Sequence, residues 1–116
     1  MSRIKFTNLP SGRVIKYAAI AASSSGNNTL VAAAGAGNKI LMLSCMLIAA
    51  GAVNVRFEDA ADGTALSGRM NLTTNSGFTA PFNEGGWFVT SANTLLNLEL
   101  SGAVAVDGML SYVEIT

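Results

Sequence analysis

The sequence contains no histidine, one cysteine and two prolines, and charged residues make up only 12% of its 116 residues. Without histidine, the chain lacks the most common general base and the imidazole ligand of many metal sites. A single cysteine, Cys45, can form neither an intrachain disulfide nor a thiolate cluster. These absences remove most catalytic chemistry. We therefore expect a non-enzymatic protein without catalytic residues, cofactor or metal.

Long apolar runs are also absent, although half of the residues are apolar and the net charge is zero. The longest run, residues 40–53, is interrupted by Ser44 and Gly51 and is shorter than the roughly 20 residues that cross a bilayer. Residues 1–16 contain no continuous apolar segment of the secretory type. We expect a folded, single-domain protein that is made in a reducing cytoplasm and does not insert into membranes.

Glycine, serine and asparagine divide the chain into short segments, as turn-forming residues do in all-β proteins. The predicted strands are residues 14–22, 29–33, 39–49, 53–58, 65–72, 87–90, 95–100 and 104–115. Gly68 predicts a bulge in the fifth of these strands, and residues 73–86 are predicted to be a loop. The pattern predicts a single jelly-roll-like sandwich or barrel of about eight antiparallel strands over residues 17–116. An extended N-terminal arm, residues 1–16, precedes it.

Two of these strands alternate strictly between apolar and polar residues, as strands do when one face lies on a core. The side chains predicted to point inward are Val53, Val55, Phe57, Leu96, Leu98 and Leu100. Those predicted to point outward are Asn54, Arg56, Glu58, Asn97 and Glu99.

The strand predicted at residues 39–49 is apolar on both faces. Simple alternation places Ile40, Met42, Met46 and Ile48 on one face and Leu41, Leu43, Cys45 and Leu47 on the other. One face must cover the core, and the other needs a second cover. That cover is either a neighbouring copy or a loop or exchanged N-terminal segment. We favour the neighbouring copy, with Leu41, Leu43 and Leu47 as interface residues.

The charges are unevenly distributed along the chain, since all seven acidic residues lie at or after Glu58. Four basic residues, Arg3, Lys5, Arg13 and Lys16, lie within the first 16 positions and alternate with apolar residues. This pattern predicts a basic arm that docks onto an acidic protein surface. The alternative is a solvated terminus. Specific nucleic-acid binding is not expected, because no aromatic stacking positions or groove-reading helix accompany the charges.

Two further groups of residues could form ligand sites. Glu58, Asp59 and Asp62 could offer oxygen atoms to calcium, but an ordinary hairpin turn with a positive φ at Asp-Gly explains this stretch better. Trp87 and Phe88 follow a glycine-rich loop and either pack at the end of the sandwich or form an aromatic platform for a sugar or peptide.

Residues 28–115 carry motifs that resemble a family of proteins. The motifs are VNVRF at 53–57, TALSGRMNL at 64–72, GF at 77–78, PFN at 81–83, GWF at 86–88, LNLELS at 96–101 and AVAV at 103–106. They resemble small accessory structural proteins of tailed-bacteriophage virions, among which capsid decoration (cement) proteins are the most common small β-rich kind. The resemblance implies a homotrimer that clamps neighbouring major capsid protein subunits, and no catalytic residue.

Two functions follow from these observations as expectations. The first is a capsid decoration protein on the virion surface, whose basic arm reaches the major capsid protein. The second is a tail, fibre or head-fibre module that binds a host receptor or glycan through Trp87 and Phe88.

Overall fold

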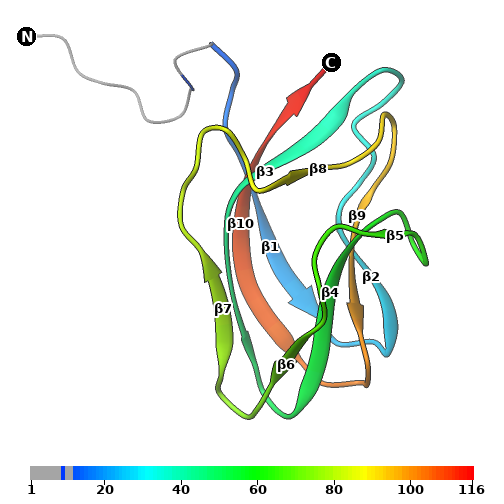
Figure 1. The fold of residues 1–116 in the computed structure, drawn as a ribbon, viewed down its shortest axis with the longest axis vertical. Coiled ribbons are helices and arrows are strands. Elements are labelled where there is room, and N and C mark those ends of the chain that lie inside the picture. The colour runs from blue at the N-terminus through cyan, green and yellow to red at the C-terminus, as the bar shows by residue number, and fades with distance from the viewer. Residues whose placement is uncertain (1–8, 10–11) are drawn as a thin grey trace, which may run out of the picture.

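The computed structural model describes Leu9 and residues 12–116, and these residues form ten strands and no helix (Figure 1). The strands are β1 Lys16–Ala22, β2 Gly26–Val31, β3 Lys39–Ala49, β4 Val53–Asp59, β5 Thr64–Ala65, β6 Met70–Leu72, β7 Gly77–Ala80, β8 Phe88–Val89, β9 Leu96–Leu100 and β10 Val106–Ile115. The prediction of an all-β sandwich is confirmed.

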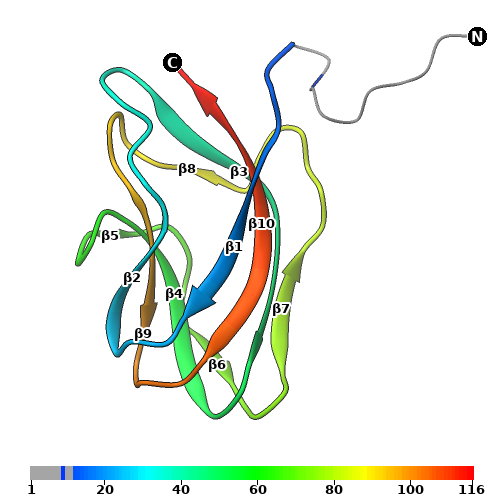
Figure 2. The ribbon, with the colours of Figure 1, turned by 180° about the vertical axis from the view of Figure 1, so that it is seen from behind.

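The strands form two antiparallel sheets of five strands each. In the β3 sheet the order is β1-β10-β3-β7, and β8 also pairs with β3. In the β4 sheet the order is β2-β9-β4-β5, and β6 also pairs with β4. The first strand pairs with the last, the second with the ninth, β3 with β7 and β8, and β4 with β5 and β6. The chain is therefore a long hairpin rolled into two layers (Figures 1 and 2).

The core lies between the two sheets and follows the predicted alternation of β4 and β9. All six side chains predicted to point inward are buried: Val53, Val55, Phe57, Leu96, Leu98 and Leu100. Phe57 lies at the centre, where its ring is 5.2 Å from that of Phe88 and 6.3 Å from that of Phe78. Period-two alternation was sufficient to find this half of the core.

Glu58 and Asn97 were predicted to face outward on half-exposed strands, but both side chains are fully buried, so the expected exposure was wrong. They lie opposite each other on β4 and β9, on the outer side of the β4 sheet. Polar partners cover both side chains, so Glu58 and Asn97 are buried although they stand at outward positions.

Strand β3 has the predicted bounds, but its two faces were assigned incorrectly. The pairing with β10 shifts between Ser111 and Tyr112, which leaves Leu43 as an extra residue on β3. A bulge of this kind reverses the alternation of a strand. The side chains that face the core are therefore Ile40, Met42, Cys45, Leu47 and Ala49.

The other differences concern the edges of the sheets. Residues 73–86 contain strand β7, although they were predicted to be a loop. The predicted strand at 65–72 is interrupted and forms β5 and β6, with Gly68 between them. A Cβ atom at Gly77 would lie 2.0 Å from the carbonyl oxygen of Leu47, so glycine allows β7 to approach β3 closely.

Candidate interaction surfaces

The outer face of the β3 sheet carries an apolar patch that no described residue covers. Its large members are Tyr17, Met46, Ile48 and Met109, which are 60%, 46%, 51% and 47% exposed. We call these four residues the outer-face patch. Because soluble monomers seldom expose large contiguous apolar areas, this patch is a candidate contact surface.

The strand register shows that the patch is continuous. Met109 of β10 lies directly opposite Met46 of β3 and opposite Ala19 of β1. Ile48 lies opposite Asp107, one row further along. Ser111 and Ser44 lie beside Tyr17 on the neighbouring strands. Their hydroxyls are hydrogen-bonded to each other, so they add little polarity to this part of the face. The four patch residues therefore form one continuous area on the neighbouring strands β1, β10 and β3.

The other half of the same face is covered by the chain itself. Leu43 and Val113 are fully buried beneath Leu9 and Ile15, in a second apolar cluster outside the main core. The segment that precedes β1 therefore adds a layer over one half of the face. This matches the alternative in which an N-terminal segment covers β3.

The three residues proposed as an oligomer interface thus have different surroundings. Leu47 is in the main core, and Leu43 is buried in the second cluster, so both are covered by their own chain. Leu41 is half-buried beside that cluster. The exposed apolar residues of β3 are instead Met46 and Ile48. Sequence reasoning missed them because the bulge at Leu43 was not recognised.

The four basic residues assigned to the arm are not equivalent. Arg3 and Lys5 lie outside the described residues. Arg13 is exposed ahead of β1. Lys16 is the first residue of β1, and its Nζ lies 2.5 Å from the Glu114 carboxylate, which raises the pKa of Lys16 through a hydrogen bond and charge attraction. Lys16 therefore belongs to the sheet, where an acidic partner already neutralises its charge.

Trp87 and Phe88 line a pocket at the open side of the sandwich, between the β7–β8 connection and the β5–β6 segment. The pocket has a volume of about 280 Å³, and its walls include Met42, Phe57 and Met70. Trp87 is 48% exposed, and its indole Nε1 donates a hydrogen bond of 2.8 Å to the Pro81 carbonyl. Phe88 is half-buried against the core. Of these two rings, Trp87 is therefore the one that presents a free aromatic face.

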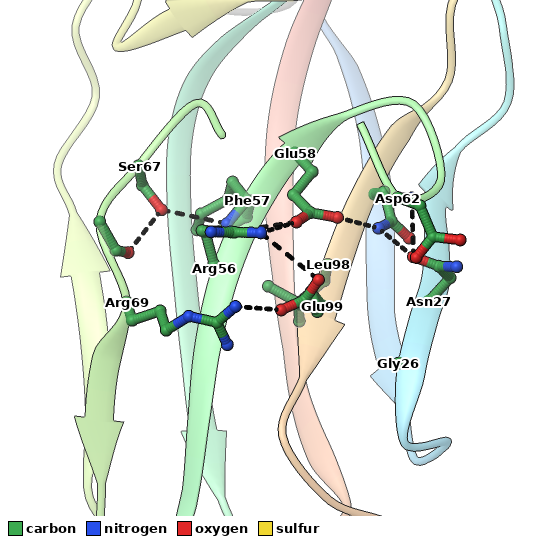
Figure 3. A network of polar contacts seen from close by, with 12 residues as sticks. Gly26, Asn27, Arg56, Phe57, Glu58, Asp62, Ser67, Arg69, Leu98 and Glu99 are labelled. Carbon is green, nitrogen blue, oxygen red and sulfur yellow. Dashed lines mark hydrogen bonds and ion pairs between the residues drawn. The ribbon is translucent and has the colours of Figure 1, made fainter. Parts of the chain in front are cut away.

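A chain of polar contacts crosses the outer side of the β4 sheet (Figure 3). The guanidinium of Arg56 donates to Glu58 and lies 3.5 Å from the carboxylate of Glu99, which also pairs with Arg69 at 2.8 Å. Asn97 donates to Glu58 at 2.9 Å. Two arginines and two glutamates thus balance one another across β4, β9 and the segment before β6.

The same chain continues to strand β2. The Nδ2 of Asn97 donates to the side-chain oxygen of Asn27 at 2.9 Å, and its Oδ1 accepts the backbone N–H of Asn28 at 2.8 Å. Asn27 also accepts the backbone N–H of Asp62 from the β4–β5 turn. Asn97 therefore ties three strands and one turn together.

Burial alone would raise the pKa of Glu58, because it penalises the charged carboxylate. The hydrogen bonds from Arg56 and Asn97 and the arginine charge outweigh this effect, so the pKa of Glu58 lies below its ordinary value. Arg56 responds in the opposite direction, and its pKa is raised by the hydrogen bond to Glu58. The pair is ionised and structural in character.

The three acidic residues that could offer oxygen atoms to calcium do not point toward a common centre. Glu58 points to Arg56, whereas Asp59 accepts hydrogen bonds from Ser91. Asp62 adopts a positive φ of 53°, as a hairpin turn requires. Within Leu9 and residues 12–116, no group of three or more acidic or cysteine side chains is placed to hold a metal ion.

The described part of the chain has no helix of the length and apolarity needed to cross a membrane.

Comparison with known protein families, with curated proteins and with solved structures found no match for this chain.

Proposed function

We propose that this protein is a non-enzymatic structural component of a tailed-bacteriophage virion. Specifically, we propose a decoration (cement) protein that binds as a homo-oligomer to the major capsid protein on the outer surface of the head. It would be made in the host cytoplasm and would stabilise the assembled shell by adding contacts that exist only after assembly.

The strand order is the observation that carries this proposal. If β5 and β6 count as one interrupted strand, and β7 and β8 as another, eight strands remain. Renumbered from 1 to 8 along the chain, they stand in the orders 1-8-3-6 and 2-7-4-5. We propose that this arrangement is a jelly roll, which has eight strands in two sheets and occurs in viral capsid domains. Lectins and cupins share the arrangement, so the fold alone does not give the function.

The side-chain chemistry of the protein supports a structural role more than a catalytic one. The whole sequence has no histidine, and the one cysteine, Cys45, is buried, which raises the pKa of its thiol to about 12. A thiol in that state is a poor nucleophile. The outer-face patch, in contrast, offers area for contacts between proteins.

Capsid binding is assigned to the basic residues ahead of β1. Arg3 and Lys5 would contact acidic surface on the major capsid protein, and several such tethers on one oligomer raise the overall affinity through effective concentration. Lys16 is a weaker candidate for this role because Glu114 already holds its ammonium group.

The experiment is co-sedimentation of the purified protein with purified capsids of the phage that encodes it. Binding should saturate at a fixed ratio to the major capsid protein. The double variant Arg3→Ser/Lys5→Ser should bind roughly ten-fold more weakly, because it loses two charge contacts. Residues 9–16 should be kept, since Leu9 and Ile15 cover part of the β3 sheet.

The matched control is Lys39→Ser/Arg69→Ser, which removes the same charge from elsewhere on the protein. It should bind capsids as well as the unmodified chain does. Absence of co-sedimentation at any concentration would overturn the proposal. Equal weakening in both double variants would refute the assignment to the N-terminal residues.

The pocket beside Trp87 favours one alternative, a tail or fibre module that binds a host receptor or glycan. An exposed indole beside an apolar hollow is a common sugar platform. In that case Trp87→Ala should abolish binding to host cells while the protein stays folded. Phe82→Ala, which removes another exposed ring nearby, should not.

A further inference from the structure

The outer face of the β3 sheet has the form of a step. One half carries the extra layer of chain formed by Leu9 and Ile15 over Leu43 and Val113. The other half is bare and consists of the outer-face patch. When a second copy is turned end for end, its raised half fits above the bare half of the first, so the face is complementary in shape to itself.

The charges at the two ends of this face are opposite. Asp107 is exposed at the bare end, where it lies opposite Ile48 and Ala21. Arg13 is exposed at the raised end, two residues before Ile15. The other charged side chains of β1, β10 and β3 lie towards the raised end: Lys39 is exposed opposite Ile115, and Lys16 and Glu114 pair with each other. In the end-for-end arrangement, Arg13 of each copy approaches Asp107 of the other, which makes the face complementary in charge as well.

The area is sufficient for a specific contact. Strands β1, β10, β3 and β7 have 7, 10, 11 and 4 residues. At about 3.3 Å per residue and about 4.8 Å between strands, they give a footprint of about 500 Å² per copy. Two copies together would bury about 1,000 Å², close to the smallest area expected of a specific protein interface.

We propose that a second copy of this chain covers the outer-face patch, in a two-fold contact between the outer faces of two β3 sheets. The two-fold axis lies in the plane of the contact and crosses the strands near Tyr17. The bare half of each copy receives the segment around Leu9 and Val14 of the other copy. The contact forms in the free protein and does not depend on the capsid binding proposed above.

The test is the native mass of the free protein, measured by size-exclusion chromatography with light scattering. The chain has a mass of 11.9 kDa, so the two-fold contact predicts a species near twice that value. A monomer at all concentrations would overturn the proposal. A species near three times 11.9 kDa, the trimer that cement proteins suggest, would overturn it too, because one two-fold contact joins only two copies.

Met46→Arg tests the surface, because it places a charge at the centre of the patch on a side chain that is exposed in the single copy. This variant should give the monomer mass with an unchanged circular dichroism spectrum. The matched control is Phe82→Arg, an exposed apolar residue of the β7–β8 connection, which should leave the dimer intact. A dimer that survives Met46→Arg would refute the contact surface.

A charge exchange tests the orientation of the two copies. Asp107→Arg should raise the dissociation constant of the dimer about ten-fold, because two exposed pairs become repulsive. The double variant Arg13→Asp/Asp107→Arg should restore it to within a few-fold of the original value. A double variant as weak as the single one would refute the end-for-end arrangement. Since no capsid is present, these results are independent of the co-sedimentation result.

Discussion

At the scale of single residues, the buried pair Glu58 and Asn97 differs most from a simple reading of the sequence. Both stand at outward positions of their strands, yet their polar groups are satisfied. Arg56 donates to Glu58, while Asn97 donates to Asn27 and accepts the backbone N–H of Asn28. Buried polar groups of this kind are stable only when all of their partners are present. The pair therefore fixes how β2, β4 and β9 align.

Replacing Glu58 tests this role. Glu58→Gln removes the charge that Arg56 binds and leaves an amide donor facing either the guanidinium of Arg56 or the amide of Asn97. We expect the free energy of unfolding to fall by about 1–3 kcal/mol, measured by urea denaturation at pH 7. Glu84→Gln, in the exposed β7–β8 connection, should change it by less than about 0.5 kcal/mol.

The pH dependence follows from the lowered pKa of Glu58 in the folded state. Its contribution to stability is complete above the ordinary value of 4.5 and is lost as the pH falls through the lower, folded value. Between pH 5 and pH 3 the unmodified protein should therefore lose more stability than Glu58→Gln does. Parallel losses in the two proteins would contradict a structural role for the ionised carboxylate.

At the scale of elements, strand positions were predicted better than strand faces. Turn residues and alternation located β3, β4 and β9 within one residue, because these signals are local. The bulge at Leu43 depends on pairing with β10, which is remote in sequence, so no local pattern reveals it. The same limit applies to the outer-face patch and to the pocket beside Trp87, which only the tertiary fold assembles.

The centre of the β3 sheet also depends on one close approach between strands. A Cβ atom at Gly108 of β10 would lie 1.9 Å from the carbonyl oxygen of Met46. Gly108→Ala should therefore destabilise the protein by about 2–4 kcal/mol, because the clash is with backbone and not with a flexible side chain. Gly102→Ala is the control, since its Cβ meets no atom within 4 Å. Thermal melts of both variants check this.

At the scale of the whole molecule, Cys45 lies between the two sheets and reports on their separation. Burial raises the pKa of its thiol to about 12, so little thiolate is present and the sulfur is out of reach of reagents. We expect a thiol reagent to modify Cys45 only when the sandwich opens. The free energy of opening derived from the labelling rate should match the free energy of global unfolding. Rapid labelling of the folded protein would show that the β3 sheet opens locally.

The position of β10 has a consequence for how the protein is made. It joins β1 to β3 at the centre of one sheet, but a ribosome synthesises it after every other strand of both sheets. Until β10 emerges, β1 has no strand to pair with and β3 exposes an unpaired edge. The period before β10 emerges is therefore when the nascent chain is most open to aggregation or to binding by chaperones.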